Sequence, residues 1–135
     1  MKETLLSDAE LSFTRSHDQF LEQWKHAMYT GETDGVDRMA NTYFVAFFMD
    51  NQPRPNFFEY DEAMEGMRQS VKECVGFEKS FENRIIRMKN QTNAIVFYEQ
   101  ILKNGERELS RLFTTEEWEL QGDQWLLTRE VDIQV

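Results

Sequence analysis

The fold is decided by residues 77–135, which read FEKSFENRIIRMKNQTNAIVFYEQILKNGERELSRLFTTEEWELQGDQWLLTREVDIQV. Apolar and polar residues alternate through most of this stretch, and a period of two is typical of half-buried β-strands. We predict four strands, at residues 77–89, 92–102, 108–120 and 124–135. The connections between them are short and rich in turn-forming residues, so the four strands should form an antiparallel meander.

The N-terminal part of the sequence carries a helical pattern instead. A capping box at residues 7–10, SDAE, predicts the start of a helix, and Gly31 can adopt the left-handed conformation that ends one. The apolar residues between them recur at spacings of three, four or seven, as one face of a helix requires: Leu6, Ala9, Phe13, Phe20, Trp24 and Met28. We therefore predict one long amphipathic helix that ends at residues 29–31.

Shorter elements connect this helix to the meander. We predict a short helix from residue 33 or 34 to about residue 41, and a third helix at residues 61–74. Residues 43–49 are rich in aromatic residues, which fits either a first strand or the buried end of a helix. A turn with two prolines at residues 50–55 leads to a short returning strand at residues 56–60. Helices first and a meander second indicate an α+β fold.

The composition is that of one globular domain spanning residues 1–135. Of the 135 residues 40% are hydrophobic and 30% are charged, and the net charge is −10. This charge disfavours binding to nucleic acids and to anionic membrane surfaces, because both partners need clustered Lys and Arg. The longest apolar run, residues 43–49, is far shorter than the ~20 residues of a membrane helix, and we expect no signal peptide. The single cysteine, Cys74, allows no internal disulfide and fits a reducing cytoplasm.

Several stretches carry a resemblance to a known family. Residues 29–36, YTGETDGV, are similar to the family's break between its first helix and a short second helix. Residues 53–67 resemble its hairpin and third helix, and residues 111–118 with residues 122–127, GDQWLL, resemble its closing hairpin. The family is the nuclear transport factor 2-like superfamily, which includes ketosteroid isomerase, scytalone dehydratase and the SnoaL-like cyclases. The resemblance covers nearly the whole chain.

The resemblance implies a cone, also called the cystatin-like fold. In it three N-terminal helices pack on a strongly curved antiparallel sheet and enclose a pocket open at one end. It further implies a homodimer formed through the outer face of the sheet and, in enzymatic members, cofactor-free isomerase, dehydratase or cyclase chemistry. In ketosteroid isomerase this chemistry uses a tyrosine on the first helix and a carboxylate near the end of the first strand. Trp24 lies in the region of that tyrosine, and Asp50 lies near the position of that carboxylate.

His17 is the most informative single residue. It shares a helical face with Phe13, Phe20 and Trp24, so its side chain should face the core. There it is either a general acid or base at a pocket or a core histidine held by one structural partner. With Asp50 and Tyr43 at the pocket mouth, His17 makes up our candidate catalytic set.

No metal site is predicted. His17 and His26 lie nine residues apart, on different faces of one helix, so they cannot chelate one ion together. The sequence also has no glycine-rich phosphate loop, and we expect no cofactor.

Charged residues within apolar rows of the strands are the second candidate feature. Arg129 is the one charge in the alternating row from Trp125 to Val135, and Glu99 and Arg111 hold similar positions in their own strands. They could form a polar floor to the pocket, with Arg129 or Arg111 binding an acidic group of a ligand. Alternatively they form an internal ion pair such as Glu99–Arg129, or lie at a dimer interface.

Aromatic residues make up 13% of the chain and suit a cavity for a planar or apolar ligand, although ordinary core packing accounts for them equally well. The predicted lining residues are Trp24, Phe20, Phe97 and Trp125.

The sequence supports two hypotheses for the function. The first is a homodimer whose pocket binds a small apolar or aromatic molecule, with acid–base chemistry as its possible reaction. The second is a non-catalytic interaction module, and a cavity of roughly 300 Å³ or more would favour the first.

Overall fold

The computed structural model describes residues 2–135, with side chains from residue 6 onward. The elements in chain order are helix α1 (Lys2–Thr30), the 3-10 helix η1 (Asp34–Val36), strands β1 (Met39–Phe48) and β2 (Asn56–Glu59), helix α2 (Tyr60–Cys74), and strands β3 (Glu78–Asn90), β4 (Asn93–Asn104), β5 (Arg107–Gln121) and β6 (Gln124–Gln134). The structure therefore confirms the α+β fold, the long first helix and the four C-terminal strands.

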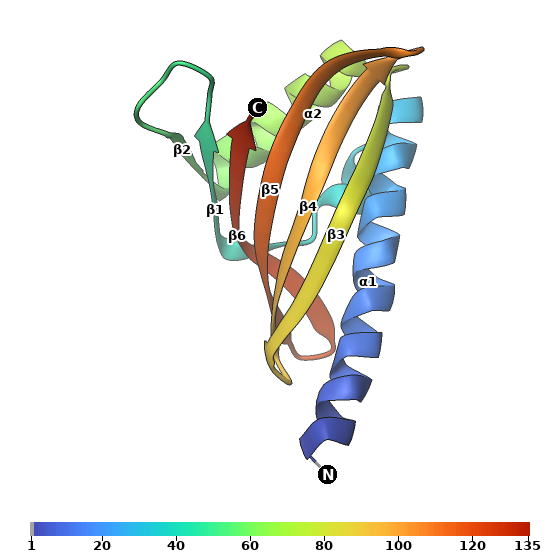
Figure 1. The fold of residues 1–135 in the computed structure, drawn as a ribbon, viewed down its shortest axis with the longest axis vertical. Helices are drawn as coiled ribbons and strands as arrows, with labels where there is room; N and C mark the ends of the chain where they lie inside the picture. Colours follow the sequence, from blue (N-terminus) through green and yellow to red (C-terminus); the bar gives the residue numbers. More distant parts are fainter. Residues whose placement is uncertain (1) are drawn as a thin grey trace.

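The six strands form one sheet in the order β2-β1-β6-β5-β4-β3. Strands β3 to β6 pair antiparallel with their neighbours in sequence, as the predicted meander requires. Strand β1 pairs antiparallel with β2 and lies parallel to β6, so the first and last strands of the chain are neighbours in the sheet. Figure 1 shows the sheet strongly curved, with α1 along the β3 side and α2 behind the upper ends of the strands.

Two of the predicted helix boundaries are wrong. The helix predicted at residues 33–41 is only the 3-10 turn of η1, because Met39 already pairs with Leu127 of β6. The predicted capping box does not start α1, because the helix begins at Lys2 and Ser7 lies inside it. Gly31 does end the helix as predicted. Its φ is 86°, and its N–H donates to the carbonyl oxygen of Ala27 over 2.7 Å.

The apolar face of α1 packs against the concave face of the sheet. Phe13 and Phe20 are buried, and both rings meet the edge of the Trp118 ring of β5, at centroid distances of 5.9 and 4.9 Å. Such edge-to-face pairs add to the free energy gained by burying the rings. The predicted helical stripe is thereby confirmed as the core-facing side of α1.

A β-bulge at Thr128 changes which side chains of β6 face the core. Glu117 of β5 pairs with Arg129, and Trp118 pairs with Leu127, so Thr128 is an extra residue without a partner in the register. The Thr128 hydroxyl donates to the carbonyl oxygen of Glu117 over 3.0 Å, which holds the bulge in place. Because side chains alternate with a period of two, one extra residue exchanges the two faces of the rest of the strand.

The exchange corrects the predicted orientation of the last strand. Before the bulge Trp125 and Leu127 are buried in the core, as expected. After it Glu130 and Asp132 face inward, and Arg129 lies on the outer, convex face. The expectation that Arg129 belongs to an inward-facing apolar row is therefore wrong.

The charged residues of the apolar rows form ion pairs on this outer face. Arg111 Nη1 lies 2.7 Å from Glu99 Oε1, and Arg129 Nε lies 3.2 Å from Glu117 Oε2. The hydrogen bond from Asn83, followed by the hydrogen bond and charge of Arg111, lowers the pKa of the Glu99 carboxyl. The expected pair between Glu99 and Arg129 does not form, because each residue has a nearer partner.

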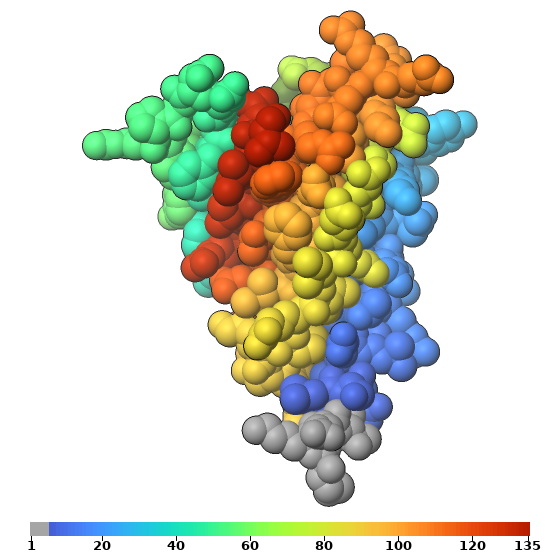
Figure 2. Space-filling model, in the orientation of Figure 1, coloured from blue at the N-terminus to red at the C-terminus, as the bar shows by residue number. Residues whose placement is uncertain are grey.

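Apolar side chains lie between these ion pairs. Phe97 and Phe113 meet edge to face with ring centroids 6.0 Å apart, and Ile85, Phe113 and Ile133 are exposed. Figure 2 looks onto this face, where β6, β5, β4 and β3 lie side by side with no helix over them. Within residues 2–135, no helix combines the length and apolar character needed to span a membrane.

Candidate functional site

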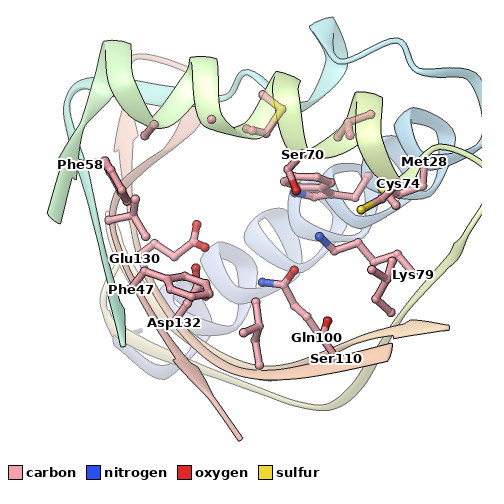
Figure 3. A pocket seen from close by; sticks show the side chains of 18 of the residues that line it. Met28, Phe47, Phe58, Ser70, Cys74, Lys79, Gln100, Ser110, Glu130 and Asp132 are labelled. Atoms are coloured by element: carbon pink, nitrogen blue, oxygen red, sulfur yellow. The ribbon is translucent and has the colours of Figure 1, made fainter. Parts of the chain in front are cut away.

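A cavity of about 290 Å³ lies between α2 and the concave face of the sheet (Figure 3). Its volume lies just below the range of roughly 300–1,000 Å³ that is typical of small-molecule pockets. Much of the wall is apolar and includes four methionines, which are Met28, Met39, Met64 and Met67. Methionine adapts its shape to irregular ligands, so this wall suits an apolar molecule. The cone is therefore not filled by its own side chains.

Two carboxyl groups project into this cavity from β6. Asp132 is only 5% exposed and Glu130 is half-buried. Burial, followed by the nearby charge of Asp132, raises the pKa of Glu130 well above its usual range. Burial likewise raises the pKa of Asp132, and a hydrogen bond from Glu130 opposes that rise. Two neighbouring carboxyl groups in an apolar site do not readily ionise together, so this pair favours a form in which one of them keeps its proton.

Neighbouring side chains fix the orientation of this acid pair. The Tyr43 hydroxyl donates to Glu130 Oε1 over 3.1 Å, and the Thr114 hydroxyl donates to Asp132 Oδ1 over 2.6 Å. Gln100 Nε2 in turn donates to the Thr114 oxygen over 2.8 Å, so the Thr114 proton is left to point at Asp132. Burial, followed by the nearby carboxyl groups of Glu130 and Asp132, raises the pKa of Tyr43, which therefore stays a proton donor at neutral pH.

One amine also lines the cavity. Lys79 of β3 places its Nζ 3.9 Å from the centroid of the Trp24 ring, a cation–π contact. Burial lowers the pKa of this amine, and the nearby acid pair of Asp132 and Glu130 opposes the lowering. In Figure 3 Lys79 and the acid pair lie at opposite sides of the cavity, with Gln100 between them.

A second buried network lies behind the cavity wall, centred on the Glu116 carboxylate. It accepts three hydrogen bonds, from His17 Nε2 (2.9 Å), Trp118 Nε1 (3.0 Å) and the Tyr98 hydroxyl (2.6 Å). The guanidinium of Arg84 lies 3.1 Å from His17 Nδ1, and because it can only donate, Nδ1 must accept. His17 is therefore the neutral tautomer with its proton on Nε2, and Glu116 is a fully satisfied buried carboxylate.

Comparison with known proteins finds similarity only in three dimensions. No family model matches the sequence, and no curated protein matches it. A nuclear transport factor 2-like protein of unknown function from Shewanella oneidensis MR-1 superposes with a TM-score of 0.70 at 21% identity, over 89% of this chain and 98% of that chain. This chain has the nuclear transport factor 2-like fold.

Two further structures agree with this assignment. A nuclear transport factor 2-like protein of unknown function from Pseudomonas putida KT2440 gives a TM-score of 0.69 at 13% identity, over 90% of this chain and 87% of that chain. LinA gives a TM-score of 0.72 at 8% identity, over 96% of this chain and 90% of that chain. The resemblance noted from the sequence is thus confirmed for the fold, and at these identities it does not extend to an activity.

The nuclear transport factor 2-like cone brings only part of the predicted site together. Trp24 and Tyr43 lie on the cavity wall. His17 and Phe20 are buried in the core and do not line the cavity, and Trp125 packs against Phe13 with ring centroids 5.0 Å apart. The catalytic role suggested for Tyr43 stays a prediction, and His17 has the structural partners of the alternative interpretation.

The remaining predicted residues lie away from the cavity. Asp50 is exposed in the turn after β1, where its backbone N–H donates to Gln134 Oε1 over 3.1 Å. The residues of the expected polar floor, Glu99, Arg111 and Arg129, lie on the outer face of the sheet instead, and so does the predicted lining residue Phe97. Strict alternation along β6, without the bulge, predicts that Arg129 faces the cavity. In β4 and β5 the inner rows contain polar residues, so a pattern of apolar-inside strands predicts that the opposite row faces the cavity.

Sequence reasoning missed the polar residues that do line the cavity. Glu130, Asp132 and Gln100 lie in rows that alternate with more apolar rows, so a pattern of apolar-inside strands places them in solvent. Lys79 was not singled out, because one lysine near the start of a strand has no distinguishing signal. Only the bulge and the curvature of the sheet bring these four side chains to one cavity.

Proposed function

We propose that the protein binds a small, largely apolar molecule in the cavity between α2 and the sheet and moves a proton on it. The observation that carries the proposal is the acid pair, Glu130 and Asp132, two carboxyl groups that project together into an apolar cavity and whose pKa values are raised by burial. A carboxylate and a carboxylic acid side by side can act as general base and general acid near neutral pH.

The proposed chemistry is the transfer of a proton from a carbon next to a carbonyl group. The Asp132 carboxylate takes the proton from carbon, and the electron pair of that C–H bond moves toward the carbonyl oxygen. Glu130 and Tyr43 supply O–H groups for the oxygen on which charge develops. Return of the proton to another carbon gives an isomerisation, and loss of a leaving group gives an elimination. Both reactions use only groups that the chain provides.

Deuterium exchange tests this proposal without knowledge of the natural substrate. The neutral ketone 2-tetralone is incubated in D₂O with the protein, and the loss of its α-proton signals is followed by ¹H NMR. We expect the wild-type protein to exchange these protons at least about 100-fold faster than Asp132→Asn, the usual size of a general-base contribution. Asp123→Asn, an exposed turn carboxyl, is the matched control and should behave like wild type. Equal rates for wild type and Asp132→Asn would refute the proposal.

We also propose that the outer face of the sheet forms a homodimer and that the protein works in the reducing cytoplasm. The dimer is supported by the exposed apolar residues Ile85, Phe113 and Ile133, which lie on a face that no helix covers. The location is supported by the presence of a single cysteine in the sequence.

A further inference from the structure

Lys79 carries an unneutralised charge at the cavity. The arginines of this protein that lie near acids form close ion pairs, such as Arg84 with Asp18 and Arg111 with Glu99, both at 2.7 Å. Among the described side chains no carboxylate forms an ion pair or a hydrogen bond with the Lys79 amine. Its one close partner is the face of the Trp24 ring.

An amine in this position costs free energy when the cavity is empty. Lys79 is half-buried, and a charge partly withdrawn from water without an ion-pair partner is unfavourable; burial lowers the pKa of the Lys79 amine for the same reason. The Trp24 ring offsets part of this cost, because its face attracts a cation, but it does not neutralise the charge. A ligand that brings an anion to Nζ would remove most of the remaining cost.

We propose that Lys79 binds a carboxylate group of the ligand, so that the ligand of this cavity is a small carboxylic acid anion with an apolar or aromatic body. This inference rests on the proposed function, because it takes the cavity as the ligand site. It assigns to Lys79 the role that the sequence suggested for Arg111 or Arg129, both of which lie on the outer face.

The arrangement of charges also decides which end of the ligand lies where. The acid pair holds a negative charge at the side of the cavity opposite Lys79 (Figure 3), so a ligand anion is repelled from Asp132 and drawn toward Nζ. The reacting carbon of the same ligand then lies toward Asp132. Lys79 is the only cationic side chain on the cavity wall among the described residues, which suits a monoanion better than a phosphate dianion.

Calorimetry with a pair of nearly isosteric probes tests the inference. We would titrate 3-phenylpropanoate and the neutral 3-phenylpropanamide into wild type, Lys79→Met, Lys79→Arg and the exposed-lysine control Lys72→Met at pH 7. We expect wild type, Lys79→Arg and Lys72→Met to bind the acid at least about tenfold more tightly than the amide. Lys79→Met should bind the two probes within about twofold of each other, and its melting curve confirms that it is folded.

Each other outcome overturns the inference. Equal affinity of wild type for acid and amide would mean that Lys79 recognises no anion, and an unchanged preference in Lys79→Met would place the anion elsewhere. If neither probe binds, the cavity does not bind this class of ligand. The deuterium exchange of neutral 2-tetralone does not depend on Lys79, so the proposed proton transfer and this inference can fail separately.

Discussion

The carboxyl groups of Glu130 and Asp132 should couple folding to pH. In the unfolded chain they titrate near pH 4, whereas burial and mutual contact raise both pKa values in the folded protein. Between the two values the folded state holds a proton that the unfolded chain has released, so the free energy of unfolding falls as pH rises through the folded pKa. The charged and titratable groups that face the pair are Tyr43 of β1, Lys79 of β3 and Glu116 of β5.

We predict that Asp132→Asn is more stable than wild type at pH 8, by about 1–2 kcal/mol, because it removes the cost of ionising the buried pair. The variant should also lose less stability than wild type between pH 5.5 and pH 8. Urea denaturation at both pH values measures these differences, with Asp123→Asn as the exposed control. The same pH dependence in wild type and Asp132→Asn would contradict the raised pKa values.

His17 is predicted to stabilise the core through Glu116. His17→Ala removes one of three donors to a buried carboxylate and leaves a cavity among aromatic rings, so we expect a loss of about 2–4 kcal/mol in the free energy of unfolding. His26→Ala is the matched control on the same helix. Its histidine is exposed and pairs with Glu32 over 3.2 Å, and its loss should cost no more than about 0.5 kcal/mol. If the two variants are equally stable, His17 is not a structural residue.

Among the secondary-structure elements, the positions of the strands could be predicted from the sequence, but not which side chains of each strand face the core. The alternation of residues 77–135 predicts all four strands of the meander within about two residues, and Gly31 predicts the end of α1. The cavity could not be predicted, because the extra residue at Thr128 exchanges the faces of β6 and nothing in the alternation marks it. A register shift depends on pairing with β5, which is a contact distant in sequence.

Deletion of Thr128 tests the importance of this bulge. Without the extra residue, either Arg129 is forced into the core or the pairing of β6 with β5 and β1 breaks beyond that point. We expect the deletion to lower the free energy of unfolding by about 4 kcal/mol or more, because burying an unpaired charge is among the most costly changes. The point substitution Thr128→Ser keeps the bulge and the hydroxyl and should cost less than about 1 kcal/mol. A deletion variant as stable as Thr128→Ser would show that β6 does not need the bulge.

At the scale of the whole molecule, the uncovered outer face predicts self-association. We expect the protein to sediment at twice its 16.2 kDa chain mass at micromolar concentration. Ile133→Asp places a charge in the middle of the exposed apolar surface and should give a monomer, because a desolvated unpaired charge opposes association. Leu11→Asp changes an equally exposed apolar residue on α1 and should leave the dimer intact. A wild-type monomer would contradict the proposed dimer.

The protonated carboxyl group that we predict for the pair of Glu130 and Asp132 can be observed directly. The measurement is a pH titration of side-chain carboxyl carbons by ¹³C NMR, in protein labelled at Asp and Glu. We expect one carboxyl signal to keep its protonated chemical shift at pH values where the exposed carboxyl groups have already ionised, and to be absent from the spectrum of Glu130→Gln. If every carboxyl group of the folded protein ionises over the same pH range as the exposed ones, the cavity holds no acid at neutral pH and the proposed proton transfer is wrong.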